Sequence, residues 1–327
     1  KPMIVLGYGL AALSKPLFPL ASSAFAVFVA RCIDRVGKGI RGAPRDALLA
    51  AEVPHEKRGL AFGFNRAADH LGAVFGPLIA SILLWIYARN PDNPTVSEYQ
   101  NVFLLASIPI VFGLFVIIFF VKEDGKSEIQ QTAPKFSLKE FDANFKRFLL
   151  VIALFTLSNS SDAFLLLRAR DAGISPPLLP ILWMFLHLSK VVSSLIGGSL
   201  SDKFGRKKLI FSGWVLYALV YLGFAFVSEA WQAWTLFLIY GIYFGLTEGA
   251  EKALVADLVP QEKRGTAFGL YNLAFGVTVF PASLLLGGIW NWFGASAAFI
   301  FSAVLSILAA IFLLTVSNST GDKRLTT

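Results

Sequence analysis

The chain has 327 residues, of which 56% are hydrophobic and 15% are charged. A soluble domain carries roughly 25% charged residues, so this composition indicates an integral membrane protein. The formal net charge of +8 could suggest a nucleic-acid partner, but the cations lie between apolar segments, and we therefore expect none. The single cysteine, Cys32, excludes an intrachain disulfide, and the three scattered histidines lack the spacing of a metal site, so we expect no metal and no cofactor.

Ten apolar segments follow one another along the chain, each of about the 20 residues that a helix needs to cross a bilayer. They predict an all-α integral membrane fold with spans at residues 3–21, 24–51, 59–87, 102–121, 147–169, 178–200, 207–227, 231–257, 265–289 and 294–316. If Lys1 is cytoplasmic, every loop on that side is cationic, and the loops on the other side are nearly free of Lys and Arg. We therefore expect a multi-pass protein of the plasma membrane, the inner membrane of a bacterium, with both ends in the cytoplasm.

The chain contains an internal repeat. The segment Val53-Pro-His-Glu-Lys-Arg-Gly-Leu-Ala-Phe-Gly63 recurs 206 residues later as Val259-Pro-Gln-Glu-Lys-Arg-Gly-Thr-Ala-Phe-Gly269. A parallel repeat of this kind is typical of transporters, which bind substrate at the interface between the repeats. Within the second half, two predicted helices precede Lys207, but none precedes its counterpart Lys1 in the first half, so we expect the chain to lack two helices. The expected divisions are a first half at 1–122, a linker at 123–146, a second half at 147–317 and a tail at 318–327.

A stripe of charge runs along the predicted helix at 24–51. On a helix of about 100° per residue, an arc of about 120° contains Arg31, Asp34, Arg35, Lys38, Arg41 and Arg45. Charge at the centre of a bilayer costs roughly 2.5 to 3.5 kcal/mol per residue, so such a stripe should face a water-filled cavity or a partner. We interpret the stripe as the lining of a transport pathway.

The loop after the predicted helix at 178–200 reads Gly198-Ser-Leu-Ser-Asp-Lys-Phe-Gly-Arg-Lys-Lys-Leu209. It resembles the G-x-L-a-D-R-x-G-R-K-x-x-L signature of the major facilitator superfamily. The resemblance implies two pseudo-symmetric six-helix bundles, of which the third to twelfth helices are present here. It also implies a gate, in which Asp202 accepts hydrogen bonds from the start of a neighbouring helix and Arg206 pairs with acids, with Gly198 and Gly205 shaping the turn. A cationic loop with a turn glycine is the alternative interpretation.

A second motif, Gly72-x-x-x-Gly76-Pro77, resembles the G-x-x-x-G-P signature in the fifth helix of superfamily antiporters, with Ala80 in place of a later glycine. In that family the motif marks exporters. Close helix packing with a proline kink would also account for it.

In the superfamily, the first, fourth, seventh and tenth helices line the cavity. On this basis the expected solute contacts are Arg31, Arg35 and Lys38 from the fourth helix and Tyr240, Phe244 and Glu248 from the tenth. Arg41 and Arg45 lie toward the cytoplasmic end, where we expect them to pair with Glu248 or Glu251 as part of the gate. The basic and acidic walls could instead form salt bridges between the two halves.

The seventh helix contains the polar run Ser158-Asn-Ser-Ser-Asp162, which suggests an unwound or hydrated segment. Asp34, Asp162 and Asp69, with His70 beside Asp69, are our candidates for proton coupling. The alternatives are a structural pair of Asp162 with Arg168 or Lys190, and a pair of Asp69 with Arg66. For His187 and Lys190 we expect bonds to neighbouring groups.

Together these features predict a monomeric secondary active transporter that works by alternating access and exports a small organic solute or drug, anionic or amphiphilic, in exchange for protons. Energy from nucleotide hydrolysis is not expected, because no Walker motif is present. The alternatives are a proton-coupled importer of an organic anion, a sensor built on a transporter scaffold, and a membrane enzyme. We expect no catalytic residues, because no enzyme motif supports the last of these.

Overall fold

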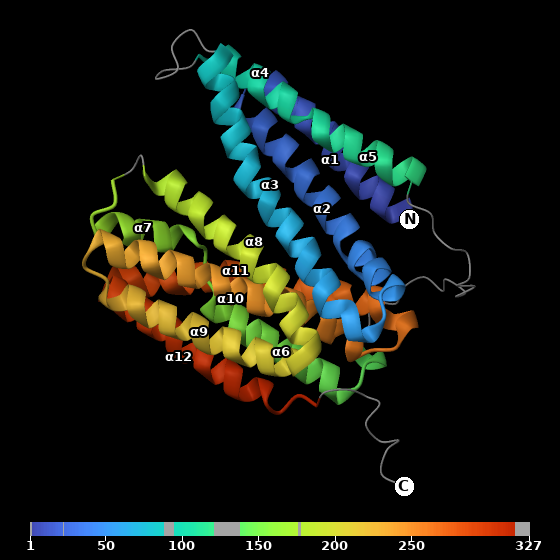
Figure 1. Ribbon diagram of the computed structural model, residues 1–327, viewed down its shortest axis with the longest axis vertical. Coiled ribbons are helices and arrows are strands. Elements are labelled where there is room, and N and C mark those ends of the chain that lie inside the picture. Colours follow the sequence, from blue (N-terminus) through green and yellow to red (C-terminus); the bar gives the residue numbers. More distant parts are fainter. Residues whose placement is uncertain (1, 22, 88–94, 121–137, 176–177, 318–327) are drawn as a thin grey trace. The chain divides into compact units, whose positions relative to one another are not determined.

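The computed structural model describes residues 2–21, 23–87, 95–120, 138–175 and 178–317, which form helices and loops with no strand among them. The all-α fold is therefore confirmed (Figure 1). The helices up to residue 120 are α1 (Pro2–Leu20), α2 (Ala24–Glu52), η1 (His55–Lys57), α3 (Arg58–Tyr87), α4 (Val96–Ala106) and α5 (Ile108–Phe120). The later ones are η2 (Leu138–Glu140), α6 (Ala143–Ser158), α7 (Ala163–Asp171), α8 (Leu179–Phe204), α9 (Arg206–Phe226), α10 (Ala230–Asp257), η4 (Gln261–Lys263), α11 (Arg264–Phe293) and α12 (Ala295–Leu313).

Each of the ten predicted spans corresponds to one helix or to two consecutive helices. The span predicted at 102–121 begins earlier, at Val96, and α4 passes to α5 at Ser107. Within the described residues, eight helical segments are long and apolar enough to cross a membrane. The helices α2 and α10 are not among the eight, and both carry several charged side chains.

The internal repeat is visible in the helix ends. Both α3 and α11 have 30 residues, and they begin 206 positions apart, at Arg58 and Arg264. Each follows a short 3-10 helix, and each starting arginine donates from Nε to the carbonyl eight residues earlier, Ala50 or Ala256, at 3.3 Å. These carbonyls are also 206 positions apart, so the repeat extends to individual hydrogen bonds.

The chain divides into two compact units. The first unit contains residues 1–48 and 72–133, and the second unit contains residues 49–71 and 134–327. The segment 49–71 thus groups with the later part of the chain, whereas the sequence places it in the first half. The reason is the set of hydrogen bonds and close glycine contacts that the start of α3 makes with α8, α9 and α10, described below.

In the first unit, α1 packs against α4 and α5. It also closely approaches α2, because a Cβ on Gly7 would lie 2.6 Å from the Gly37 carbonyl oxygen, and a Cβ on Gly37 would lie 2.7 Å from that of Gly7. Glycine at both positions therefore allows the two backbones to meet.

In the second unit, helices α6 to α12 pack side by side (Figure 1). An aromatic core fills the space between them. Phe155 of α6 stacks on Trp214 of α9 with ring centroids 4.3 Å apart, and Tyr217 stacks on Tyr221 at 4.1 Å. The helices α8 and α10 are pressed together at Gly197 and Gly245, where a side chain on either residue would collide with the backbone of the other helix. This contact fixes the side chains that α8 and α10 direct toward each other.

Candidate functional site

The predicted interruption of the span at 147–169 is confirmed: α6 ends at Ser158 and α7 begins at Ala163. Tyrosines from neighbouring helices bond to the unwound residues. Tyr217 of α9 donates to the Ser158 carbonyl at 2.7 Å, and Tyr240 of α10 donates to Asp162 Oδ1 at 2.8 Å. These bonds satisfy a carbonyl at the helix end and hold Asp162 against α10.

Lys190 of α8 lies beside Asp162. Its Nζ is 3.8 Å from Asp162 Oδ2 and 3.4 Å from the centre of the Phe244 ring, and the side chain is only 5% exposed. The rings of Trp183 and Tyr240 lie 5.9 and 6.0 Å from the same nitrogen. The Lys190 ammonium therefore lies among three aromatic rings with one carboxylate nearby. This Asp162–Lys190 pair is one of the alternatives that the sequence analysis left open.

A histidine–glutamate pair also lies near Phe244, with the His70 and Phe244 ring centroids 6.5 Å apart. His70 Nε2 of α3 is 3.1 Å from Glu248 Oε2 of α10, and the His70 ring is 5.3 Å from the ring of His187 on α8. His187 also contacts Trp183, edge to face, at 5.3 Å. One turn before His70, Arg66 Nη2 bonds to Asp69 Oδ2 at 2.8 Å, which is the alternative considered for Asp69.

We name these side chains the central polar cluster. It brings together four residues predicted to form the site, Asp162, Tyr240, Phe244 and Glu248, and His70, a candidate for proton coupling, with three that the sequence did not assign to it, namely Trp183, His187 and Lys190. The expectation of bonds to neighbouring groups is met for Lys190 by its ion pair with Asp162, although no hydrogen bond joins Lys190 Nζ to an acceptor within the described part of the chain. It is not met at Nδ1 of His187, which is buried without a hydrogen-bond partner among the described residues. The spacing of Trp183, His187 and Lys190, at i, i+4 and i+7 on one helix face, was the signal that could have identified them.

The predicted residues of α2 lie in the first unit. Asp34 pairs with Lys15 of α1 at 3.1 Å, a partner that the sequence analysis did not anticipate. The Arg31 guanidinium lies 5.6 Å from the Phe18 ring, while Arg35 and Lys38 are exposed. The charge stripe is thus present on α2, and its contact with solute remains a prediction.

A second polar cluster joins the start of α3 to the end of α8. Asp202 Oδ1 accepts from the Gly59 amide at 2.9 Å, and Asp202 Oδ2 accepts from the Leu60 amide at 2.8 Å. Arg206, at the first turn of α9, donates to Asp202 and to the His55 carbonyl. A carboxylate at the first turn of a helix is favoured by the free N–H groups and the positive end of the helix dipole.

Asp257, at the end of α10, completes this helix-end cluster and was missed by the sequence analysis. Arg58 Nη1 donates to Asp257 Oδ1 at 2.7 Å, and Arg206 Nε donates to Asp257 Oδ2 at 3.1 Å. The exposed His55 ring lies 3.2 Å from the same Oδ2. The Asp257 side chain is 4% exposed, so two guanidinium groups compensate a nearly buried carboxylate.

Glycines allow the helix-end cluster to form. A Cβ on Gly59 would collide with the Ser201 hydroxyl and would lie 2.6 Å from the Gly198 carbonyl. Gly205, between α8 and α9, has a φ of +97°, a conformation that L side chains rarely adopt. The predicted gate residues Gly198, Asp202, Gly205 and Arg206 therefore lie together, while their action as a gate remains a prediction.

Within the second unit Glu251 has two bonding partners, and its pairing with a gate arginine of the first unit stays a prediction. Glu251 Oε1 accepts from Trp214 Nε1 at 3.1 Å, and Oε2 accepts from the Tyr271 hydroxyl at 2.7 Å. Both bonds come from neutral side chains in the aromatic core of the second unit. Arg45 bonds to the adjacent Asp46 at 3.2 Å, and Arg41 lies 4.0 Å from the Tyr8 ring.

The motif of Gly72 and Gly76 lies on α3. A Cβ on either glycine would meet nothing within 4 Å in the part of the chain that the structure describes. The Pro77 side chain lies outside the described residues. Close helix packing, the alternative interpretation of this motif, therefore has no partner among the described residues, and the resemblance to exporters stays a prediction.

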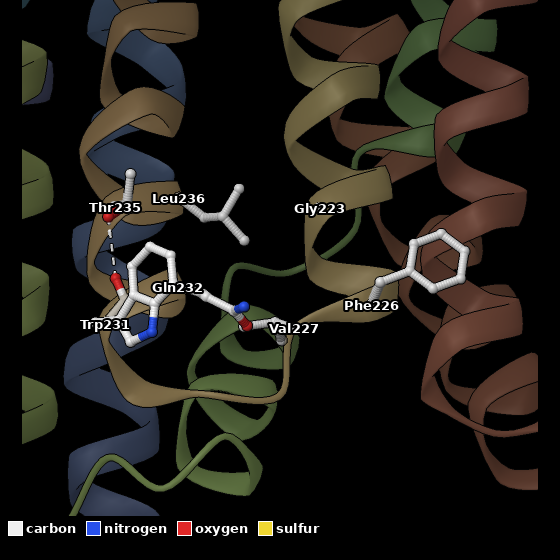
Figure 2. A pocket seen from close by; sticks show the side chains of 7 residues that line it. All are labelled: Gly223, Phe226, Val227, Trp231, Gln232, Thr235 and Leu236. Atoms are coloured by element: carbon white, nitrogen blue, oxygen red, sulfur yellow. Dashed lines mark hydrogen bonds between the residues drawn. The ribbon is translucent and has the colours of Figure 1, made fainter.

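A separate pocket of about 310 Å³ lies at the turn between α9 and α10 (Figure 2). Its lining is mostly apolar and consists of Gly223, Phe226, Val227, Trp231, Gln232, Thr235 and Leu236. No side chain in this lining is ionisable, so the pocket offers no chemistry for a proton or a charged solute. Across the described ranges, no three His, Cys, Asp or Glu side chains are grouped as a metal site.

The sequence was compared with known families and proteins. A family model described as Major Facilitator Superfamily matches residues 1–280 and also residues 148–326. An uncharacterized MFS-type transporter of Methanocaldococcus jannaschii is 34% identical over 323 residues, which cover 96% of this chain and 78% of the relative. A multi-drug resistance efflux pump PmrA homolog of Lactococcus lactis is 23% identical over 275 residues, covering 81% of this chain and 65% of the pump.

Solved structures share the fold. The proton:xylose symporter XylE superposes with a TM-score of 0.77 at 16% identity, covering 96% of this chain and 79% of the symporter. The human organic anion transporter MFSD10 also superposes with a TM-score of 0.77, at 15% identity, covering 95% of this chain and 76% of the transporter. At these identities the likeness concerns the fold alone.

Proposed function

Because the chain belongs to the major facilitator superfamily, whose members are transporters and not enzymes, we propose that it exports a small organic solute, anionic or amphiphilic, in exchange for protons. The proposed mechanism is alternating access by a monomer in the plasma membrane with both ends in the cytoplasm. A solute and protons are the proposed partners, and the lipid bilayer is the surrounding medium.

The observation that carries the proposal is the central polar cluster. Asp162, Lys190 and Glu248 are ionisable side chains in the interior of a bundle of largely apolar helices. Such groups are costly within a membrane and mark solute or proton pathways by default. The interrupted helix at Asp162 adds unwound backbone, which membrane proteins tolerate only when it is buried in protein or lines a cavity.

The cluster supports proton coupling through two carboxylates. Protonation of Asp162 would remove the charge opposite Lys190, and protonation of Glu248 would remove the charge opposite His70. Either event changes the electrostatic cost of exposing or burying the cluster, so protonated and unprotonated forms would favour different orientations of the transporter. Asp34 and Asp69 are further candidates, although both already bond to cationic partners, Lys15 and Arg66.

The helix-end cluster supports a gate. Asp202 and Asp257 join the beginning of α3, in the first repeat, to α8, α9 and α10, in the second. We place this end of the helices on the cytoplasmic side, because the adjoining loops contain the cationic runs His55–Arg58 and Lys203–Lys208. Opening toward the cytoplasm would then require these bonds to break.

Export is favoured over import by two observations. The Gly72-x-x-x-Gly76-Pro77 motif resembles that of antiporters, and a drug efflux pump is among the distant relatives. Import of an organic anion is the second candidate, favoured by the basic stripe on α2 with Arg31, Arg35 and Lys38. Transport measured in everted and in right-side-out vesicles would separate the two directions.

Proton release from the purified protein in detergent tests the coupling. Organic anions, cationic drugs and neutral solutes are added in turn to the parent protein and to Asp34→Asn, Asp162→Asn and Glu248→Gln, with the exposed Asp171→Asn as a control. We expect one class of solute to release protons, and one of the three variants to abolish the release. Solute binding without proton movement in any sample would overturn proton antiport.

A further inference from the structure

Two buried nitrogens on one face of α8, Lys190 Nζ and His187 Nδ1, have no hydrogen-bond partner among the described residues. The Lys190 side chain is 5% exposed, and His187 is 9% exposed. His187 Nδ1 is buried without a partner, and no described acceptor bonds to Lys190 Nζ, although an ammonium carries three donors. Buried donors of this kind normally have partners, so their absence from the described residues calls for an explanation.

The nearest charge only partly compensates Lys190. An ammonium hydrogen-bonded to a carboxylate lies about 2.7 to 2.9 Å from the oxygen, whereas Asp162 Oδ2 is 3.8 Å away. The Phe244 ring, 3.4 Å from Nζ, attracts the cation but accepts no conventional hydrogen bond. Lys190 therefore keeps the capacity to bind a further anionic oxygen.

The other charged groups around these donors are already engaged. On α10, Glu248 pairs with His70 of α3, and on α3 Arg66 pairs with Asp69. Asp162, between α6 and α7, accepts from Tyr240 with its other oxygen. No hydrogen bond joins Glu248 or Asp162 to the two nitrogens of α8 among the described residues, and the contact of Asp162 with Lys190 is an ion pair at 3.8 Å.

We propose that Lys190 and His187 bind the carboxylate of an aromatic organic acid, whose ring lies against Trp183 and Phe244. The inference rests on the proposed transport function, because it assigns the solute class to the same cluster. A carboxylate offers two acceptor oxygens, which match two donors one helical turn apart. The surrounding indole, phenol and phenyl rings provide an apolar lining with which an aromatic acid can stack.

The site includes a built-in competitor. The carboxylates of Asp162 and of the ligand compete for the Lys190 ammonium, so ligand binding weakens the Asp162–Lys190 contact. Removing the Asp162 charge should therefore strengthen binding, whereas removing Lys190 should weaken it. If the Asp162–Lys190 pair served only to stabilise the fold, removing either charge would destabilise the folded protein. The two substitutions would then not have opposite effects on ligand binding.

Equilibrium binding to the purified full chain tests the site with three probes of similar shape: 1-naphthoate, 1-naphthamide and 1-naphthylmethylamine. We expect naphthoate to bind best. Lys190→Met should weaken naphthoate binding by about tenfold or more, and Lys190→Arg should retain it, because hydrogen bonds to charged groups carry differences of that size. Lys208→Met, an exposed lysine on α9, is the matched control and should bind like the parent.

Asp162→Asn should tighten naphthoate binding by roughly threefold to tenfold. The double variant Asp162→Asn with Lys190→Met removes both charges together, so neither charge is left buried without the other. It serves as a folded control for the single variants, and it should still bind naphthoate poorly. Unchanged binding by Lys190→Met would overturn the site. Preferred binding of the amine, lost in Phe244→Leu, would also overturn it and would show that the rings hold an ammonium of the ligand.

The two proposals fail in different ways. If Lys190 is needed for naphthoate binding but no proton moves in the parent protein, the site stands and proton coupling fails. If solutes release protons equally from the parent and from Lys190→Met, the proposed function stands and the carboxylate site fails.

Discussion

Asp257 is expected to hold the helix-end cluster together, and Asp257→Asn isolates its charge at nearly constant shape. The asparagine amide keeps one oxygen, which can accept from either Arg58 or Arg206, and its NH2 group then faces the remaining arginine. A hydrogen bond to a charged group contributes about 1.5 to 3 kcal/mol, and each arginine keeps a second acceptor. The exposed His55 adds little. We therefore expect a loss of about 3 kcal/mol from the closed cluster, or roughly 100-fold in its opening equilibrium.

Cysteine labelling measures that opening. Ser201 is fully buried beneath Gly59, so Ser201→Cys in a Cys32→Ser background reacts with N-ethylmaleimide only when the cluster opens. If opening is rare and rapidly reversed, the labelling rate follows the opening equilibrium and should rise roughly 100-fold with Asp257→Asn. The exposed Asp171→Asn should leave the rate unchanged. A rate for Asp257→Asn within twofold of the parent would refute the assignment of Asp257 as a clamp.

Three further substitutions probe the packing: Gly59→Ala and Glu251→Gln in the second unit, and Gly72→Ala in the first. Gly59→Ala should lower stability by about 1 to 3 kcal/mol, because the new Cβ collides with Ser201, while Gly72→Ala should be neutral within about 0.5 kcal/mol, because its Cβ meets no described atom within 4 Å. Equal melting temperatures for these two variants would contradict this. Glu251→Gln should lower the melting temperature through a loss of about 1 to 3 kcal/mol, because one acceptor for Tyr271 or its neighbouring indole becomes a donor. An unchanged melting temperature would show that the carboxylate is dispensable.

The membrane helices could be predicted because their signals are local in sequence. An apolar run long enough to cross the bilayer predicts a helix whatever it packs against. Helix ends were less predictable. The helix α4 begins at Val96, six residues before the predicted span, since its first turn is polar and capped by Thr95 and Glu98. A prediction based on hydropathy does not detect polar end turns of this kind.

The partners of charged side chains could not be predicted, because they depend on contacts between distant helices. The repeat relates Arg58 to Arg264, but it relates Asp257 to Ala51, so comparison of the two copies gives no signal for the acid of the helix-end cluster. In the same way, the sequence contains the spacing of His187 and Lys190, but it does not show that the Phe244 ring of another helix lies 3.4 Å from Lys190 Nζ.

The polar groups buried in the second unit fall into two classes that differ in how completely they are bonded. Both oxygens of Asp202, Asp257 and Glu251 accept hydrogen bonds, so removing any of these acids mainly breaks contacts that the protein already makes. Lys190 and His187 are buried with donors that the described residues do not satisfy, a state that costs about 1 to 3 kcal/mol for each group. A ligand that supplies the missing acceptors recovers this cost on binding. The incompletely bonded groups are therefore where we expect selectivity for the solute to arise, and the fully bonded acids are where we expect the transporter to be held closed.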